Sequence, residues 1–265
     1  MIPIMNEKKY VEDLMELSKL PSEVSPNRMI TLLTKYYYSS EKNEQEVADL
    51  VCSAMEKYNL KIEYYQDYLA RNRIKRVFSS ICNGRTPLLK ESDNIPLYQS
   101  EFNNIMSCSP DRERKILFVL YIIARHTDKY GWVYLPDSDI YKLANVSKTS
   151  KNQPNIFYNL LQAKKIKFTK RVDDLKVGVE LSDGQEPIVL EIKEFKHMGN
   201  QLISFVREEY KMCEECGKLI KKKNNKKKYC KKCAYEKENI RKRENARKHR
   251  EKHREATFCS EIENL

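Results

Sequence analysis

The sequence has little glycine, no long apolar run and no leader-like pattern in its first residues, and each absence argues against a class of protein. Only six of its 265 residues are glycine, which is unlike a collagenous chain or a β-barrel and favours helices. The longest apolar block, Ile116–Ala124, is far shorter than the roughly 18 residues of a membrane span. The first residues lack a basic segment followed by an apolar one, so we expect a cytoplasmic protein with no membrane partner. In that compartment its eight cysteines are expected to be thiols or metal ligands rather than disulfides.

The excess of positive charge lies in one short segment. The chain has 50 Lys and Arg against 38 Asp and Glu, a net charge of +12. Residues 1–210 hold 31 basic and 29 acidic residues, a net of +2, whereas residues 211–254 hold 19 and 6, a net of +13. Such a local basic block predicts binding to a polyanion, DNA or RNA, and a solvated tail that aids solubility is the alternative.

Four cysteines in the same segment have the spacing of a zinc site. Cys213 and Cys216 form one C-x2-C pair, and Cys230 and Cys233 form a second pair thirteen residues later. Zinc prefers four soft donors in a tetrahedron, so we expect these four thiolates to hold one structural Zn²⁺ with no open catalytic position. The lysine-rich residues between the pairs are expected to form the tip of a short hairpin. Unmetallated thiols are the alternative.

Residues 233–256, directly after the second pair, have the composition of an exposed helix. They contain no Gly or Pro, and Glu lies three or four residues before Lys or Arg, as in Glu244 and Lys248. Without an apolar stripe the helix can neither bury a face nor form a coiled coil, so we expect it to contact phosphates. The predicted phosphate contacts are Lys221, Lys222, Lys223, Lys226, Lys227 and Lys228 between the cysteine pairs, and Arg241, Lys242, Arg243, Arg247, Lys248 and Arg250 in the helix.

The pattern of residues 111–181 predicts a domain of its own, made of three helices, a strand and a hairpin. Apolar residues recur at helical spacing in three stretches, and two alternating runs at the end flank a polar turn. The expected elements are a helix over 111–128, a strand over 130–135, helices over 136–144 and 154–163, and a hairpin of 166–171 with 176–181.

This order resembles the winged helix-turn-helix family over residues 111–181. In that family the third helix enters the major groove of DNA, and the hairpin, called the wing, touches backbone or minor groove. Pro154 at the start of the third helix and the long turn before it depart from the family pattern, and a domain that contacts only protein is the alternative. The resemblance implies DNA contacts by Lys148, Ser150, Lys151, Asn152, Gln153, Asn155 and Asn159 around the third helix and by Lys170, Arg171 and Lys176 on the wing.

The remaining segments predict structure rather than chemistry. Residues 1–110 have the helical periodicity of a small bundle, and 188–192 and 202–206 are both expected to be strands. The basic group Arg71, Arg73, Lys75 and Arg76 is interpreted as a solvated face, with a phosphate contact as the alternative. We expect a mainly α fold with small β-hairpins (α+β), composed of a helical N-terminal domain (1–110), a winged-helix domain with added strands (111–210), a four-cysteine zinc knuckle (211–235) and a basic helix and tail (236–265).

The combination of these parts resembles uncharacterised DNA-binding proteins of bacteriophages and mobile elements of Gram-positive bacteria. It implies a non-enzymatic protein of the bacterial host cytoplasm or nucleoid, either a phage or plasmid transcriptional regulator or a replication initiator. Duplex DNA is the expected partner, with a homodimer if the site is palindromic and with no small-molecule substrate. An RNA-binding or protein-inhibiting anti-defence factor is the alternative. A nuclease is disfavoured because the sequence has no His-Asn-His arrangement and no phosphate loop.

Overall fold

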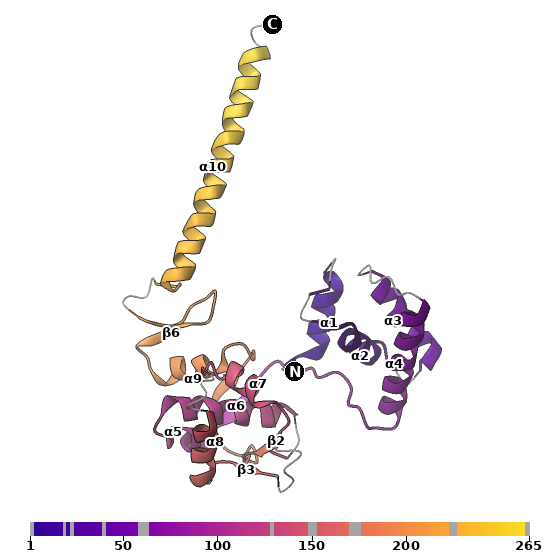
Figure 1. Ribbon diagram of the computed structural model, residues 1–265, viewed down its shortest axis with the longest axis vertical. Helices are drawn as coiled ribbons and strands as arrows, with labels where there is room; N and C mark the ends of the chain where they lie inside the picture. Colours follow the sequence, from indigo (N-terminus) through magenta and orange to yellow (C-terminus); the bar gives the residue numbers. More distant parts are fainter. Residues whose placement is uncertain are drawn as a thin grey trace. The chain divides into compact units, whose positions relative to one another are not determined.

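The chain folds into two compact units, Met1–Pro96 with Glu191–Phe195 and Leu97–Leu190 with Lys196–Leu265. The computed structural model describes residues 3–17, 20–21, 24–38, 41–57, 64–127, 130–147, 153–169, 176–222 and 227–262, without the side chains of 64–67, 153–155, 249 and 251–262. Helices dominate, and the strands form small sheets (Figure 1). The predicted fold class, mainly α with small β-hairpins, is confirmed.

The described part of the first unit is a helical bundle. Asn6, Ser25 and Asn43 each precede a helix and accept a hydrogen bond from the backbone N–H three residues later, which satisfies an otherwise unpaired donor. The second helix packs against the other three, so its residues Met29 and Leu33 are completely buried. The helices are α1 (Glu7–Glu16), α2 (Pro26–Tyr37), α3 (Glu44–Glu56) and α4 (Tyr64–Cys82).

The second unit is built around one buried helix, α6 (Asp111–Thr127). Its residues from Ile116 to Ala124 are all 2 % exposed or less, which is typical of a helix that is apolar on every side. Four other helices pack on it, α5 (Gln99–Met106), α7 (Asp137–Leu143), α8 (Gln153–Gln162) and α9 (Met198–Val206).

A three-stranded antiparallel sheet completes the predicted order of elements in residues 111–181. Its strands are β2 (Trp132–Val133), β3 (Lys167–Phe168) and β4 (Val177–Gly178), with β4 in the centre. Trp132 and Lys167 lie opposite Gly178, and Val133 and Phe168 lie opposite the buried Val177. One side of the sheet therefore faces the core, and the other carries Trp132 and Lys167. A second, two-stranded sheet joins β1 (Ile95–Tyr98) to β5 (Ile188–Ile192).

Residues 202–206 lie in helix α9, so the prediction of a strand there was wrong. Met198, Leu202 and Ile203 are buried at helical spacing and face α6. A run of five apolar residues fits a buried strand and a buried helix equally well, and only the packing partner distinguishes them. The strand expected over 188–192 is present as β5.

Helix α5 belongs to the second unit, although residues 1–110 were expected to form one N-terminal domain. Its residue Ile105 is completely buried, and Glu101, 2 % exposed, accepts hydrogen bonds from the Arg125 side chain and the Ser182 backbone N–H. A buried carboxylate requires such partners, so α5 is held to α6 by charge as well as by apolar contact.

Helix α9 approaches the end of α7 so closely that position 199 has no space for a side chain. A Cβ atom on Gly199 would overlap the backbone carbonyl oxygen of Ala144. The glycine therefore sets how closely the two helices pack.

We expect Gly199→Ala to lower the free energy of unfolding by about 1–3 kcal/mol, because the two helices must separate. The sign is informative, since Ala is otherwise favoured over Gly in a helix by about 1 kcal/mol. Urea unfolding followed by circular dichroism measures the change. Ser204→Ala in the same helix is the control, and an unchanged or higher midpoint for Gly199→Ala would contradict the packing argument.

Candidate metal centre

The first cysteine pair lies in the turn of a small hairpin. Strands β6 (Tyr210–Met212) and β7 (Leu219–Lys221) are antiparallel, and Met212 pairs with Leu219. Within the turn the backbone N–H of Gly217 donates to the carbonyl of Cys213 at 2.9 Å, and Gly217 has a φ of +63°, which favours glycine. The hairpin was expected to have the lysine-rich residues between the two cysteine pairs at its tip. In the structure the turn of the hairpin holds the first cysteine pair, and Lys221 ends strand β7.

The second cysteine pair lies at the start of a long helix, α10 (Lys231–Ile262). Cys230 precedes the helix and Cys233 lies in its first turn, so one turn of backbone brings both sulfur atoms to the hairpin. The four Sγ atoms of Cys213, Cys216, Cys230 and Cys233 all lie within 4.8 Å of one another, close enough to hold a metal ion. Those of Cys216 and Cys230 are 3.8 Å apart. We call residues 210–233 the cysteine knuckle.

Backbone N–H groups point at these sulfur atoms and favour thiolates. The N–H of Cys230 donates to Sγ of Cys213 at 3.3 Å, and the N–H of Cys233 donates to Sγ of Cys230 at 3.5 Å. Burial alone would raise the pKa of Cys213, but backbone N–H groups including those of Cys216 and Cys230 outweigh it and lower that pKa to about 6.

Hydrogen bonds within the cluster shift the pKa values of Cys230 and Cys233 in opposite directions. The pKa of Cys230 is lowered, chiefly by the N–H of Cys233. The pKa of Cys233 is raised, because the sulfur atoms of Cys216 and Cys230 accept a hydrogen bond from its thiol. A metal ion bound by all four thiolates would have to displace this proton, because the ligands of a metal must be deprotonated.

Asn200 of α9 and His197, which precedes that helix, fasten the knuckle to the rest of the second unit. Asn200 is 8 % exposed, and its Nδ2 donates to the carbonyl oxygen of Gly217 at 3.0 Å. Its Oδ1 accepts from Nζ of Lys115 on α6, also at 3.0 Å. The ring of His197 occupies the space that a Cβ on Gly217 would need. The turn that carries the first cysteine pair is therefore seated directly on the helical core.

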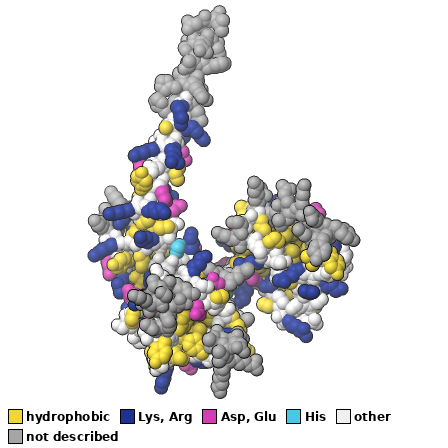
Figure 2. Space-filling view, viewed as in Figure 1, with side chains coloured by type: hydrophobic (Ala, Val, Ile, Leu, Met, Phe, Trp, Pro, Cys, Tyr) yellow, Lys and Arg dark blue, Asp and Glu magenta, His cyan; other side chains and the backbone are white. Residues whose placement is uncertain are grey.

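The predicted phosphate contacts of α10 are all on its exposed surface. Every side chain from Ile240 to Lys248 is exposed, as is Arg250. Figure 2 shows Lys and Arg side chains distributed along this helix. Arg241 pairs with Glu238 at 3.0 Å and Arg250 donates to the carbonyl of Ala246, so these two are also held by their own helix.

The lysines between the cysteine pairs are only partly described. Lys221 ends strand β7 and is exposed, as are Lys222 and Lys228. Lys228 lies 3.6 Å from Glu214, which is on the turn with the first cysteine pair. Lys227 is half-buried, and Lys223 and Lys226 lie outside the described residues.

Most of the residues expected to contact DNA around the third helix and on the wing lie outside the described part of the chain, or have side chains that are not described. Asn159 on α8 is exposed, but its Nδ2 donates to Glu113 of α6 at 2.8 Å, so its amide is engaged within the protein. Gln153 and Asn155 lie in the first turn of α8, and their side chains are not described. Lys148, Ser150, Lys151, Asn152, Lys170 and Arg171 lie outside the described residues.

An aromatic and lysine-rich surface beside the wing was not identified from the sequence. Lys176 lies 4.5 Å from the ring centre of Tyr134, and Lys167 lies 5.4 Å from that of Trp132. Gly178 lies between Trp132 and Lys167, and a Cβ there would be 2.9 Å from Lys167 and 3.0 Å from the indole. The pairing of short strands brings these side chains together, and no local pattern in the sequence could have revealed it.

Comparison of the chain with protein-family models, curated proteins and solved structures finds no match. In the described part of the chain, no helix combines the length and apolar character needed to cross a membrane.

We expect Asn200→Ala to lower the free energy of unfolding by about 1–3 kcal/mol, because it leaves the Gly217 carbonyl and the Lys115 ammonium without their partner. The exposed Asn103→Ala is the control, with a change within about 0.5 kcal/mol. Urea unfolding of the metal-loaded protein measures both. Equal midpoints for the two variants would show that Asn200 does not hold the knuckle.

Proposed function

We propose that the cysteine knuckle holds one structural Zn²⁺. A tetrahedron with Zn–S bonds of about 2.3 Å has edges of about 3.8 Å between sulfur atoms, which is the separation of Cys216 and Cys230. The donor set is sulfur only, which suits zinc better than magnesium or calcium. Cys213, Cys216, Cys230 and Cys233 would fill all four positions, so the ion would organise the hairpin and the start of α10 rather than activate water.

We expect the purified chain to carry about one zinc ion, as a full shell of four thiolates implies. Cys216→Ser should lose most of the metal, whereas Cys82→Ser, which replaces an exposed cysteine of α4, should keep it. Native mass spectrometry and elemental analysis give the stoichiometry. Full zinc content in Cys216→Ser, or iron in place of zinc in the unmodified chain, would contradict the proposal.

We infer that the protein is a non-enzymatic, duplex DNA-binding protein in which the basic helix grips phosphates. One observation carries this proposal: α10 begins inside the cysteine cluster, exposes its basic side chains, and belongs to the segment that holds a net charge of +13. A helix with an excess of positive charge, whose side chains from Ile240 to Lys248 are all exposed, suits a polyanion. The knuckle would fix its first turn to the core of the second unit.

The second unit also offers an arrangement suited to DNA. Its order of helices and strands is the one that resembles the winged helix-turn-helix family, which supports contact by α8 and by the wing. Tyr134, Lys167 and Lys176 add basic and aromatic groups to the same region. Such a protein would act in a bacterial host as a phage or plasmid transcriptional regulator or replication initiator. Protection of a promoter operator would favour the first role, and binding to repeats within an origin the second.

The triple variant Arg241→Gln/Arg243→Gln/Arg247→Gln should bind duplex DNA more weakly and with a shallower salt dependence. If all three contact phosphates, the slope of log K against log salt should change by up to about 2.7. The control Lys8→Gln/Lys9→Gln/Lys42→Gln removes the same charge from exposed positions of the first unit. Fluorescence anisotropy with a labelled duplex, over a range of salt concentrations, measures both.

The same titration separates DNA from the alternative partners. Single-stranded DNA and structured RNA of equal length are run beside the duplex. Equal slopes for the two triple variants would contradict a phosphate grip by α10. A preference for RNA over duplex DNA would instead support the RNA-binding alternative.

A further inference from the structure

The solvent side of α4, in the first unit, carries a polar trough with an excess of positive charge. Residues 68–90 contain six Lys and Arg and no Asp or Glu. The buried residues of α4, from Ala70 to Ile81, repeat every three or four positions and face the core. At 100° per residue, Lys75, Arg76 and Ser79 lie on the opposite side of the helix.

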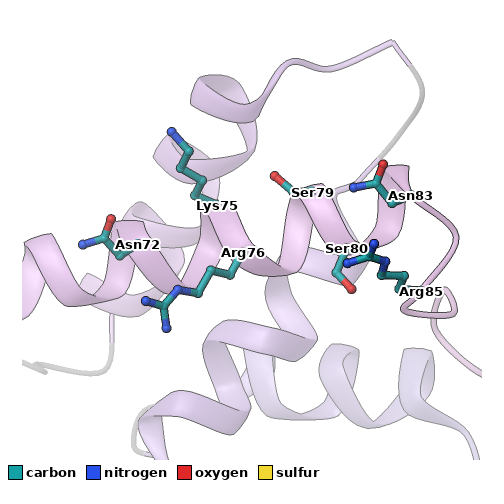
Figure 3. A pocket seen from close by; sticks show the side chains of 7 residues that line it. All are labelled: Asn72, Lys75, Arg76, Ser79, Ser80, Asn83 and Arg85. Atoms are coloured by element: carbon teal, nitrogen blue, oxygen red, sulfur yellow. The ribbon is translucent and has the colours of Figure 1, made fainter.

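The trough has cationic walls and a small polar floor. Figure 3 shows Lys75 and Arg76 leaving the helix in different directions, with Ser79 further along the same helix. Because serine is short, it leaves space between the two longer side chains. The hollow measures about 410 Å³, and Asn72, Asn83 and Arg85 also line it.

The turn after α4 supplies the third cation. Gly84, with a φ of +65°, reverses the chain, and the backbone N–H of Arg85 donates to the carbonyl of Ser80 at 2.9 Å. The hydroxyl groups of Ser80 and Thr86 are 2.7 Å apart, which fixes the segment after the turn against the helix. Arg85 is therefore held beside the end of the trough rather than on a free loop.

The cations of the trough differ from the other two on the helix. Arg71 pairs with Asp49 at 3.2 Å, and Arg73 donates to the hydroxyl of Thr31. In contrast, no acidic residue of the described chain forms an ion pair with Lys75, Arg76 or Arg85. Like charges around one hollow repel one another, and a bound anion relieves that repulsion.

We propose that this trough binds phosphate groups. Arginine presents a planar fork of N–H donors that matches two phosphate oxygens, lysine adds a point charge, and Ser79 and the two asparagines add neutral donors. None of the described residues that line the trough is Asp or Glu, so no carboxylate there competes for these donors. The phosphate could belong to a nucleic-acid strand or to a free anion, since both present the same oxygens. The site is independent of the cysteine knuckle and of α10, which lie in the second unit.

The test is an NMR titration of the isotopically labelled full chain, following the backbone amides of Ser79, Ser80 and Asn83. One arm adds inorganic phosphate and the other adds a twelve-nucleotide DNA strand. The variant Lys75→Gln/Arg76→Gln removes two cations of the trough. Arg71→Gln/Arg73→Gln removes the same charge from the same helix and is the matched control. Lys75→Arg/Arg76→Lys keeps the charge and checks that this part of the helix tolerates substitution.

We expect saturable shifts in the unmodified chain, the matched control and the charge-keeping variant, with affinity at least about tenfold lower in Lys75→Gln/Arg76→Gln. Shifts with the DNA strand alone would identify a polynucleotide as the source, and shifts with inorganic phosphate a free anion. The proposal is overturned if neither probe shifts these amides in the unmodified chain, or if the two Gln variants lose affinity equally. Because the readout lies on α4, failure of DNA binding by α10 would leave its outcome unaffected.

Discussion

The side-chain amide of Asn200 links the central helix α6 to the turn that carries the first cysteine pair. No pattern in the sequence indicates that these two segments are neighbours. Asn200 is buried on α9, accepts a hydrogen bond from Lys115 of the central helix and donates one to Gly217 in the turn of the first cysteine pair. Burying an amide whose oxygen and nitrogen both form hydrogen bonds costs little free energy of folding. If either atom loses its partner, the fold pays the full desolvation penalty of that group. Asn200 therefore links the cysteine knuckle to the helical core, together with the contact between His197 and Gly217.

The proposed contact of α10 with phosphates depends on this attachment of the cysteine knuckle to the helical core. A helix as polar as α10 has no apolar face with which to orient itself, so its direction must be set at one end. Cys230 and Cys233 place that end in the four-cysteine cluster, and Asn200 and His197 contact the adjoining turn. On this view the zinc ion acts in recognition only indirectly, because it fixes where the basic side chains begin. The trough of α4 would contribute phosphate contacts from the other compact unit.

Much of the local structure was predictable because it depends on short-range patterns. The C-x2-C spacing identified the four cysteines, and the structure brings their sulfur atoms within 4.8 Å of one another. The order of elements over residues 111–181 followed from apolar periodicity and is observed. The strand expected over 202–206 was wrong because its apolar run is too short to show a period, and packing on α6 selects a helix. Trp132 and Lys167 are 35 positions apart in sequence, and only the pairing of both with Gly178 on β4 places them side by side.

The sequence by itself determined the fold class, the four cysteines that could hold a metal ion and the location of the excess charge, since each is a property of composition or of residues close along the chain. Tertiary structure alone decided how these parts are connected. It placed α5 with the second unit, seated the knuckle on α9 and separated the engaged arginines of α4 from the cations of the trough. The physical reason is that hydrogen bonds such as that between Asn200 and Gly217, and ion pairs such as that between Arg71 and Asp49, depend on distances between residues that only the folded backbone brings together.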